Sequence, residues 1–304
     1  MPAVTDQAQR LREMIESLHP EAPVVALRPE YRKVRTIAVT SGKGGVGKSN
    51  IVANLAIALS RRGKKVLVVD ADLSLANIHV LLGLQPHFNL SHVINGEKRL
   101  GEVMIEGPAG VKVIPASSGI AELAMLRERE LEGLIHQFQG FLPEMDLILV
   151  DTAAGLADSV LSFVHAAREV LVVTTPEPTA YLDAYQMLKN IHLHEPSKKV
   201  HLVVNMASSE KEAEKTGSFM SEMSVRFLGH PLNLLGSVLR DPDMPIAVRN
   251  QRAFLEEAPH GIASRGIQTL TTRLLNSLCE EGSEDRDVGG LWKRVATYLK
   301  GRKA

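Results

Sequence analysis

The sequence has a single cysteine, no excess of charge of either sign and no long apolar run. Cys279 alone cannot form an intramolecular disulfide, nor can it build a cysteine-rich metal or iron–sulfur site within one subunit. Lysine plus arginine and aspartate plus glutamate number 35 each, so a nucleic-acid or membrane partner must be met by a local patch. No stretch approaches the roughly 20 apolar residues of a spanning helix, and the amino terminus has no signal-peptide core. We therefore expect a cytoplasmic protein unless something anchors it peripherally.

One glycine-rich segment narrows the function more than any other part of the chain. Residues 42–49 read Gly-Lys-Gly-Gly-Val-Gly-Lys-Ser, which fits the phosphate-loop pattern G-x-x-x-x-G-K-[ST]. A strand-like apolar run over 36–40 precedes the segment, and residues 51–59 have helical apolar spacing, so a chance glycine-rich turn is the weaker alternative. Its glycines expose backbone N–H groups to an anion, and the helix amino terminus adds positive charge. The predicted nucleotide-binding residues are Gly42, Lys43, Gly44, Gly45, Val46, Gly47, Lys48, Ser49 and Asn50.

Three aspartates follow apolar strands and complete the predicted site. Asp70 and Asp72 end the run that begins at residue 65, and Asp151 ends the run over 147–151, in the manner of a Walker B motif. Ligands of open α/β sheets bind at the carboxyl ends of the strands, so these carboxylates are expected to meet the phosphate loop. Lys48 would hold the β- and γ-phosphates of ATP, while Ser49, Asp70 and Asp151 would bind Mg²⁺. Each aspartate taken alone is equally explained as a helix cap or turn residue.

Alternating strand-like and helical segments predict the fold class. The expected strands are 36–40, 65–70, 111–115, 147–151, 169–175, 200–205 and 234–239. Continuous Val, Ile and Leu runs separated by helices indicate a doubly wound, mostly parallel α/β sheet with helices on both faces. We expect an ATPase domain over 34–279, preceded by a helix and linker over 1–33. An acidic linker over 280–290 and a basic amphipathic helix over 291–304 follow it.

The phosphate loop and both acidic segments resemble those of the deviant-Walker ATPases of the MinD/ParA family. The resemblance rests on Lys43 within the loop and on residues 70–77 and 151–155. It implies slow, Mg²⁺-dependent ATP hydrolysis by a homodimer that forms with ATP, in which Lys43 crosses the interface to the partner's phosphates. Asp72 would be the switch aspartate required for hydrolysis, so Lys43, Lys48 and Asp72 form the expected catalytic set. The alternative for Lys43 is a solvated surface charge.

Within that family, residues 174–180 and 183–185 look like the signature of the flagellar-number ATPases of the FlhG (FleN/YlxH) group. The resemblance implies regulation of flagellar number and placement. It also likens an amino-terminal helix to the segment by which such proteins stimulate an FlhF-type GTPase, with Asp6, Gln7, Leu11 and Arg12 as the contacts. Ser74, His79 and Ala153 depart from the usual pattern in the switch regions, which leaves the hydrolysis rate open.

Family likeness also places two residues at the base of the nucleotide. Asn205 and Arg240 end strands where adenine contacts occur, although a strand-end cap explains Asn205 equally well.

The carboxyl-terminal segment has one apolar helical face. The residues that share this face are Leu291, Trp292, Val295, Tyr298 and Leu299. Lys293, Arg294 and Lys300 occupy the opposite side, a pattern typical of an interfacial anchor on the anionic inner face of the cell membrane. The alternative is a helix docked on its own domain, and both arrangements can occur in different nucleotide states.

Other functions remain compatible with these motifs. A chromosome- or plasmid-partitioning ATPase would bind DNA, which the neutral charge does not favour. A division-site ATPase is a further alternative, and so is a nucleotide-gated anti-activator that sequesters a flagellar transcription regulator. A component of the flagellar switch complex is another candidate partner.

Overall fold

The computed structural model describes residues 34–72, 77–116, 122–123, 125–141, 144–279 and 288–301. The chain divides into two units, Met1–Tyr31 and Arg32–Ala304, and all described residues belong to the second. The predicted amino-terminal contacts Asp6, Gln7, Leu11 and Arg12 lie outside the described residues. Ser74 and residues 280–287 of the predicted linker lie outside them as well.

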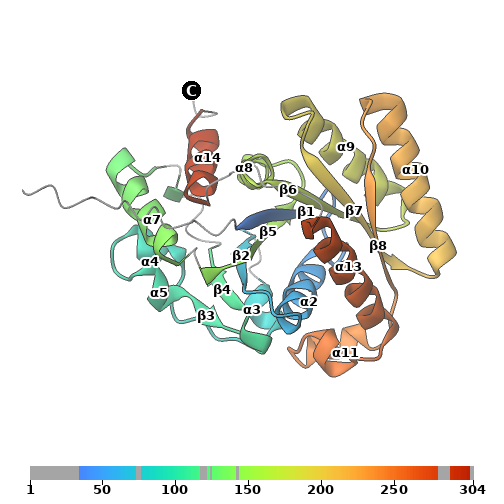
Figure 1. Cartoon of the computed structure of the whole chain (residues 1–304), viewed down its shortest axis with the longest axis horizontal. Helices are drawn as coiled ribbons and strands as arrows, with labels where there is room; N and C mark the ends of the chain where they lie inside the picture. Colours follow the sequence, from blue (N-terminus) through green and yellow to red (C-terminus); the bar gives the residue numbers. More distant parts are fainter. Residues whose placement is uncertain are drawn as a thin grey trace, which may run out of the picture. The chain divides into compact units, whose positions relative to one another are not determined.

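The described residues form one eight-stranded sheet of order β3-β4-β2-β5-β1-β6-β7-β8 (Figure 1). Its strands are β1 (Arg35–Ser41), β2 (Val66–Ala71), β3 (Ile105–Glu106), β4 (Lys112–Pro115), β5 (Leu147–Ala154), β6 (Glu169–Thr174), β7 (Lys199–Ala207) and β8 (Asn233–Leu239). Every pairing is parallel except that of β3 with β4. The expected doubly wound, mostly parallel sheet is therefore confirmed. The sequence did not reveal β3, because two residues are too few to show a period.

Helices cover both faces of the sheet (Figure 1). They are α2 (Lys48–Arg61), α3 (Ile78–Leu81), α4 (Leu90–Ile94), α5 (Leu100–Val103), α7 (Glu128–Phe141), α8 (Asp158–Ala166), α9 (Pro178–His194), α10 (Glu210–Leu228), α11 (Met244–Arg249), α12 (Phe254–Glu257), α13 (Ile262–Cys279) and α14 (Val288–Gly301), with a 3-10 turn at Pro108–Gly110. Helices α2 and α13 contribute to the core on one face, and α7, α8, α9, α10 and α14 contribute to the core on the other.

Successive residues of the central strands belong alternately to these two cores. In β2, Val66 and Val68 pack on the side of α2, whereas Leu67 and Val69 pack on the opposite side. Side chains of a strand alternate between faces, so a strand that is covered on both faces must be apolar throughout. This explains why the central strands are continuous apolar runs in the sequence.

Helix α14 docks between α7 and α8. The Trp292 ring stacks on Phe138 at a centroid distance of 4.4 Å and meets Phe163 edge-on at 5.8 Å. The Arg294 guanidinium donates two hydrogen bonds, of 3.0 and 2.7 Å, to the Ala166 carbonyl, which caps the end of α8.

The apolar face of α14 is thus turned to the domain, the alternative that the sequence left open. Leu291, Trp292 and Val295 are buried, and Tyr298 and Leu299 pack partly buried against the same core. The helix begins at Val288, three residues before the predicted start at Leu291. Among the described residues, no helix is both long and apolar enough to cross a membrane.

A buried ionic cluster joins the amino ends of three central strands. Glu169, the first residue of β6, forms an ion pair with Arg35 of β1 and accepts a 2.8 Å hydrogen bond from His201 of β7. Burial alone raises the pKa of Glu169, but hydrogen bonds and charge from His201 and Arg35 outweigh it and lower the pKa to about 2. The cluster lies at the opposite end of the strands from the phosphate loop, so it serves the fold and not the site.

Candidate nucleotide-binding site

The phosphate loop connects the end of β1 at Ser41 to the start of α2 at Lys48. Gly45 and Gly47 have positive φ angles of 81° and 82°, which turn the backbone in a way that side chains disfavour. Gly42 packs against the backbone of α9: a Cβ at this position would lie 2.2 Å from the Asp183 carbonyl carbon. Only glycine fits there, because the α9 backbone would have to move for any side chain.

The loop borders a cavity of about 480 Å³ at the carboxyl ends of the strands. The residues that line it are Ser41, Gly44, Gly45, Val46, Gly47, Lys48, Ser49, Asn50, Asp72, Asn77, Val80, Leu81, Ala154, Met206 and Val248. Seven of the predicted nucleotide-binding residues, Gly44 to Asn50, are therefore brought together around one cavity.

The Lys48 ammonium forms a buried ion pair with Asp151. Its Nζ lies 2.6 Å from Asp151 Oδ1, and both side chains are almost wholly buried. Burial raises the pKa of the Asp151 carboxyl, while the charge and hydrogen bond of Lys48 and a hydrogen bond from Ser49 oppose the rise. Lysine, serine and aspartate from the loop and from β5 thus already meet at one point.

Asp70 stands directly beside Asp151 in the sheet, since the two residues are partners in the ladder between β2 and β5. Asp70 Oδ2 accepts a 3.1 Å hydrogen bond from the Ile78 backbone N–H. Burial and the neighbouring Asp151 carboxylate raise the pKa of Asp70 to about 7. Asp70 Oδ1 and Asp151 Oδ2 are buried with no hydrogen-bond partner among the described residues. Two adjacent carboxylates with bare oxygens are the arrangement that a hard divalent cation would satisfy.

Asp72 lines the same cavity, two residues beyond Asp70. Its charge raises the pKa of both Asp70 and Asp151, which places all three carboxylates in one electrostatic neighbourhood. Residues 73–76, which follow it, lie outside the described residues. His79, one of the departures from the family pattern, precedes the cavity residues Val80 and Leu81, and burial lowers the pKa of its ring.

Lys43, in contrast, does not line the cavity. Its Nζ donates hydrogen bonds to Glu177 Oε2 at 3.1 Å and to Thr179 Oγ1 at 3.0 Å, at the start of α9. The Lys43 side chain is 40% exposed and that of Glu177 is 64% exposed. Of the two loop lysines, Lys48 therefore faces the cavity of its own subunit and Lys43 lies on the surface beside it.

Asn205 contacts the phosphate loop through its side chain. Its amide donates a 2.8 Å hydrogen bond to the Val46 carbonyl, and the side chain has no exposed surface. A Cβ on Gly47 would come within 2.3 Å of the Asn205 amide nitrogen, so the two are in close contact. Arg240 is exposed at the end of β8 and is not part of the cavity lining. The base contacts expected of Asn205 and Arg240 stay predictions.

Sequence reasoning missed the apolar part of the cavity. Met206 follows Asn205 with a φ of 58°, a left-handed conformation that is unusual for a methionine. Val248 comes from α11, and Val80 and Leu81 come from α3. The position of Met206 after a strand-end asparagine was a usable signal, but nothing in the sequence marks Val248 as a site residue.

Comparisons with known proteins identify relatives of this chain in sequence and in fold. A family model named ParA, described as the NUBPL iron-transfer P-loop NTPase, matches residues 33–275. The antiactivator FleN of Pseudomonas aeruginosa is 41% identical over 241 residues, which span 79% of this chain and 86% of FleN. The flagellum site-determining protein YlxH of Helicobacter pylori is 33% identical over 301 residues, 97% of this chain and 100% of YlxH. The crystal structure of the Pyrococcus furiosus cell division ATPase MinD superposes with a TM-score of 0.64 at 25% identity, covering 80% of this chain and 99% of MinD.

Proposed function

The chain belongs to the ParA/MinD family of P-loop NTPases, and we propose that it is an ATP-dependent dimerising switch that regulates flagellar number and placement. P-loop NTPases of this family are ATPases. The observation that carries the proposal is the different placement of the two loop lysines. Lys48 is buried against Asp151, whereas Lys43 is held at the surface, where a second subunit can receive it.

The described residues fit Mg²⁺ and ATP. The glycines of the loop can present backbone N–H groups to phosphate, and Lys48 supplies a buried ammonium for the β- and γ-phosphates. Asp70 and Asp151 each have a buried carboxylate oxygen with no hydrogen-bond partner among the described residues, and these oxygens could bind a cation. Ser49, Asp70 and Asp151 would hold Mg²⁺, which when bound neutralises charge on the phosphate oxygens. The iron transfer named in the family model is not carried over, because one cysteine per subunit cannot hold a cluster.

Hydrolysis needs a positioned water and two lysines. Asp72 accepts a hydrogen bond from the attacking water, whose oxygen bonds to the γ-phosphorus as the bond from phosphorus to the β,γ-bridging oxygen breaks. The products are ADP and inorganic phosphate, and the proton of the water leaves with phosphate or solvent. Lys48 and the partner's copy of Lys43 stabilise the charge on the phosphoryl oxygens. A site that is completed only by two subunits makes dimerisation depend on the γ-phosphate.

The turnover of such a shared site depends on protein concentration, which gives the test. The specific ATPase rate of the wild type should rise with protein concentration and then reach a plateau, because only the dimer is active. Lys43→Ala should remain at the low monomer rate at every concentration while still binding ATP. The matched control is Lys189→Ala, which removes an exposed lysine of α9 away from the loop. A wild-type rate independent of concentration, or a fully active Lys43→Ala, contradicts the proposal.

We extend the proposal to membrane residence controlled by α14. The helix carries the single tryptophan of the chain on its buried face, so Trp292 emission reports docking directly. Without nucleotide, acrylamide should quench Trp292 weakly. With ATP and vesicles containing anionic lipid, emission should change and the protein should sediment with the vesicles, because two helices per dimer bind by avidity. Sedimentation of a chain that ends at Gly290 contradicts this part of the proposal.

The proposal of an FlhF-type GTPase as partner depends only on the amino-terminal segment. Leu11→Ala should abolish stimulation of such a GTPase while leaving ATP-dependent dimerisation intact, because the segment precedes the ATPase domain. A GTPase that responds equally to the wild type and to Leu11→Ala contradicts this assignment.

Two of the similar proteins suggest alternative functions. FleN is named an antiactivator, which favours a nucleotide-gated module that sequesters a transcription regulator. MinD is a cell division ATPase, which favours a role at the division site. Flagellar counts and cell lengths in a strain lacking this chain separate the possibilities: altered flagellar number supports the proposal, and minicells support the division role. Asp72→Ala with full biological output would favour the antiactivator.

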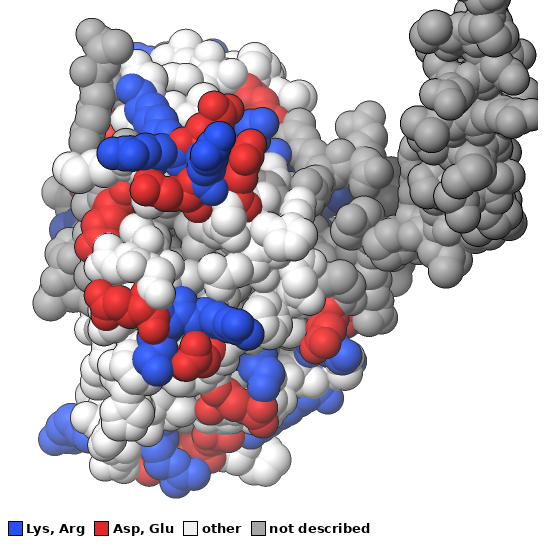
Figure 2. Space-filling model, turned by 90° about the vertical axis from the view of Figure 1, so that its left-hand side faces the viewer, with Lys and Arg blue, Asp and Glu red and all other residues white. Residues whose placement is uncertain are grey.

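Partitioning on DNA is the least supported alternative. On the face shown in Figure 2, basic and acidic side chains are interspersed among the residues drawn in colour. Among the residues that Figure 2 colours by charge, that face shows no continuous basic patch of the kind that binds a phosphate backbone.

A further inference from the structure

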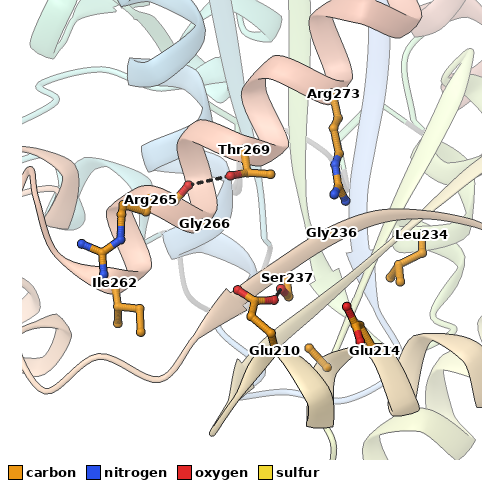
Figure 3. A pocket seen from close by; sticks show the side chains of 11 residues that line it. Glu210, Glu214, Leu234, Gly236, Ser237, Ile262, Arg265, Gly266, Thr269 and Arg273 are labelled. Atoms are coloured by element: carbon orange, nitrogen blue, oxygen red, sulfur yellow. Dashed lines mark hydrogen bonds between the residues drawn. The ribbon is translucent and has the colours of Figure 1, made fainter.

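A cavity away from the nucleotide site lies along the edge of the sheet. Strand β8 is the last in the strand order and pairs with β7 alone among the described strands. A cavity of about 350 Å³ runs beside it between α10 and α13 (Figure 3). Edge strands present unpaired backbone N–H and C=O groups, which extended peptides use to add a strand.

The two walls of this cavity, here called the edge groove, carry opposite charges. Glu210 and Glu214 come from α10, and Arg265 and Arg273 come from α13 (Figure 3). Among the described residues, no ion pair joins the two walls. Glu210 accepts a 2.8 Å hydrogen bond from Ser237 on β8, so one carboxylate is held at the floor of the groove.

Among the described residues, the guanidinium groups of the basic wall donate hydrogen bonds to backbone carbonyls. Arg273 Nη1 donates a 2.9 Å hydrogen bond to Leu235 on β8, and Arg265 Nη1 donates a 2.6 Å hydrogen bond to His260. No carboxylate among the described residues forms an ion pair with either arginine. Each wall therefore retains charge that an occupant of the groove could neutralise.

The walls stand on opposite faces of the sheet. Helix α13 belongs to the core that includes α2, and α10 belongs to the core that includes α8 and α9. An added strand would point successive side chains alternately to these two faces. Basic side chains would then meet the glutamates of α10, and acidic side chains would meet the arginines of α13.

We propose that the edge groove binds an extended segment of a partner protein in which basic and acidic residues alternate. The segment would pair with β8 as a ninth strand, and where it reaches the Leu235 carbonyl it would replace the hydrogen bond that Arg273 donates there. A second copy of this chain fits less well, since pairing of two β8 edges about a two-fold axis perpendicular to the sheet sets α10 beside α10 and α13 beside α13. Like charges would then face each other on both sides. A simple anion or cation would meet one favourable and one unfavourable wall.

Two labelled octapeptides of equal composition test the proposal on the full-length protein. One alternates lysine with glutamate, and the other has four lysines followed by four glutamates. Fluorescence anisotropy should show the alternating peptide binding at least about tenfold more tightly, because only its charges segregate by face. Equal affinities, or no binding of the alternating peptide, would overturn the proposal.

Matched substitutions then assign each wall. Replacing the lysines of the alternating peptide with threonine should weaken binding about fivefold to wild type and less to Glu214→Gln. Replacing the glutamates of the peptide with threonine should likewise weaken binding to wild type, and should weaken binding to Arg265→Gln less. Glu222→Gln, an exposed position of α10 outside the groove, serves as the control and should match the wild type.

Glu214 and Arg265 line the edge groove and are not among the residues that line the nucleotide cavity. ATPase activity therefore reports correct folding independently of peptide binding. Losses that are equal in Glu214→Gln and in Glu222→Gln overturn the assignment. If Arg265→Gln instead changes the sedimentation of the protein alone and no peptide binds, the groove joins two copies and the proposal is wrong.

Discussion

The contact between Lys43 and Glu177 predicts a variant with a stronger switch. In the structure Lys43 Nζ is held 3.1 Å from Glu177 Oε2. If Lys43 crosses to the phosphates of a second subunit, it must leave Glu177 when the dimer forms. Glu177→Gln removes the charge that holds it in the monomer and keeps the Thr179 contact. The variant should therefore dimerise more readily than the wild type.

The size of the effect follows from the exposure of the pair. An exposed ion pair contributes roughly 0.2–1 kcal/mol, and two such pairs are broken per dimer, which gives roughly 0.4–2 kcal/mol. The dimer dissociation constant should fall by a factor of about 2 to 30. Raising the ionic strength should shrink the difference between variant and wild type, because salt screens exposed charges.

Sedimentation velocity with a non-hydrolysable ATP analogue measures this constant. Glu222→Gln removes another exposed carboxylate, from α10, and is the control. The decisive comparison places Glu177→Gln in a Lys43→Ala background, where it should have no effect. A weaker dimer in Glu177→Gln, or an equal effect with and without Lys43, refutes the reasoning.

Three further predictions concern the loop and the core. Gly42→Ala should abolish nucleotide binding and lower the free energy of unfolding by about 1–3 kcal/mol, measured by calorimetry and urea unfolding, since its Cβ would overlap the α9 backbone. Asn205→Ala should weaken ATP and GTP binding equally if the amide only supports Val46, whereas a selective loss of ATP binding would indicate a base contact. Glu169→Gln should cost about 3–5 kcal/mol in urea unfolding at pH 7 by leaving Arg35 buried without its carboxylate. Because the folded pKa of Glu169, about 2, lies below the usual 4.5, its stabilisation is present above pH 4.5 and is lost as the pH falls toward 2, so the two proteins should converge in acid.

The sequence predicted well those parts of the molecule whose residue pattern is compatible with a single structure. A strand covered on both faces must be apolar throughout, so β2 and β5 could be located from their residues alone. The parallel ladder then places Asp70 beside Asp151 as a consequence of topology. The phosphate loop followed in the same way, since its glycine pattern serves few other purposes.

Elsewhere one sequence pattern is compatible with two structures, and the sequence alone does not distinguish them. The apolar face of α14 satisfies a membrane or a groove equally, and Trp292 lies against Phe138 in the structure. An asparagine at a strand end can reach a base or a backbone carbonyl, and Asn205 reaches Val46. The edge groove arises from α10 and α13, which are distant in sequence and carry ordinary surface charges.

We propose that ATP joins two subunits through Lys43. Sedimentation velocity of Asp72→Ala, whose bound ATP should persist, tests it most directly. With ADP the protein should sediment as a monomer, with ATP as a dimer, and with ATP in the Lys43→Ala, Asp72→Ala double variant as a monomer again. A monomer of Asp72→Ala in ATP, or a dimer of the double variant, would contradict the account.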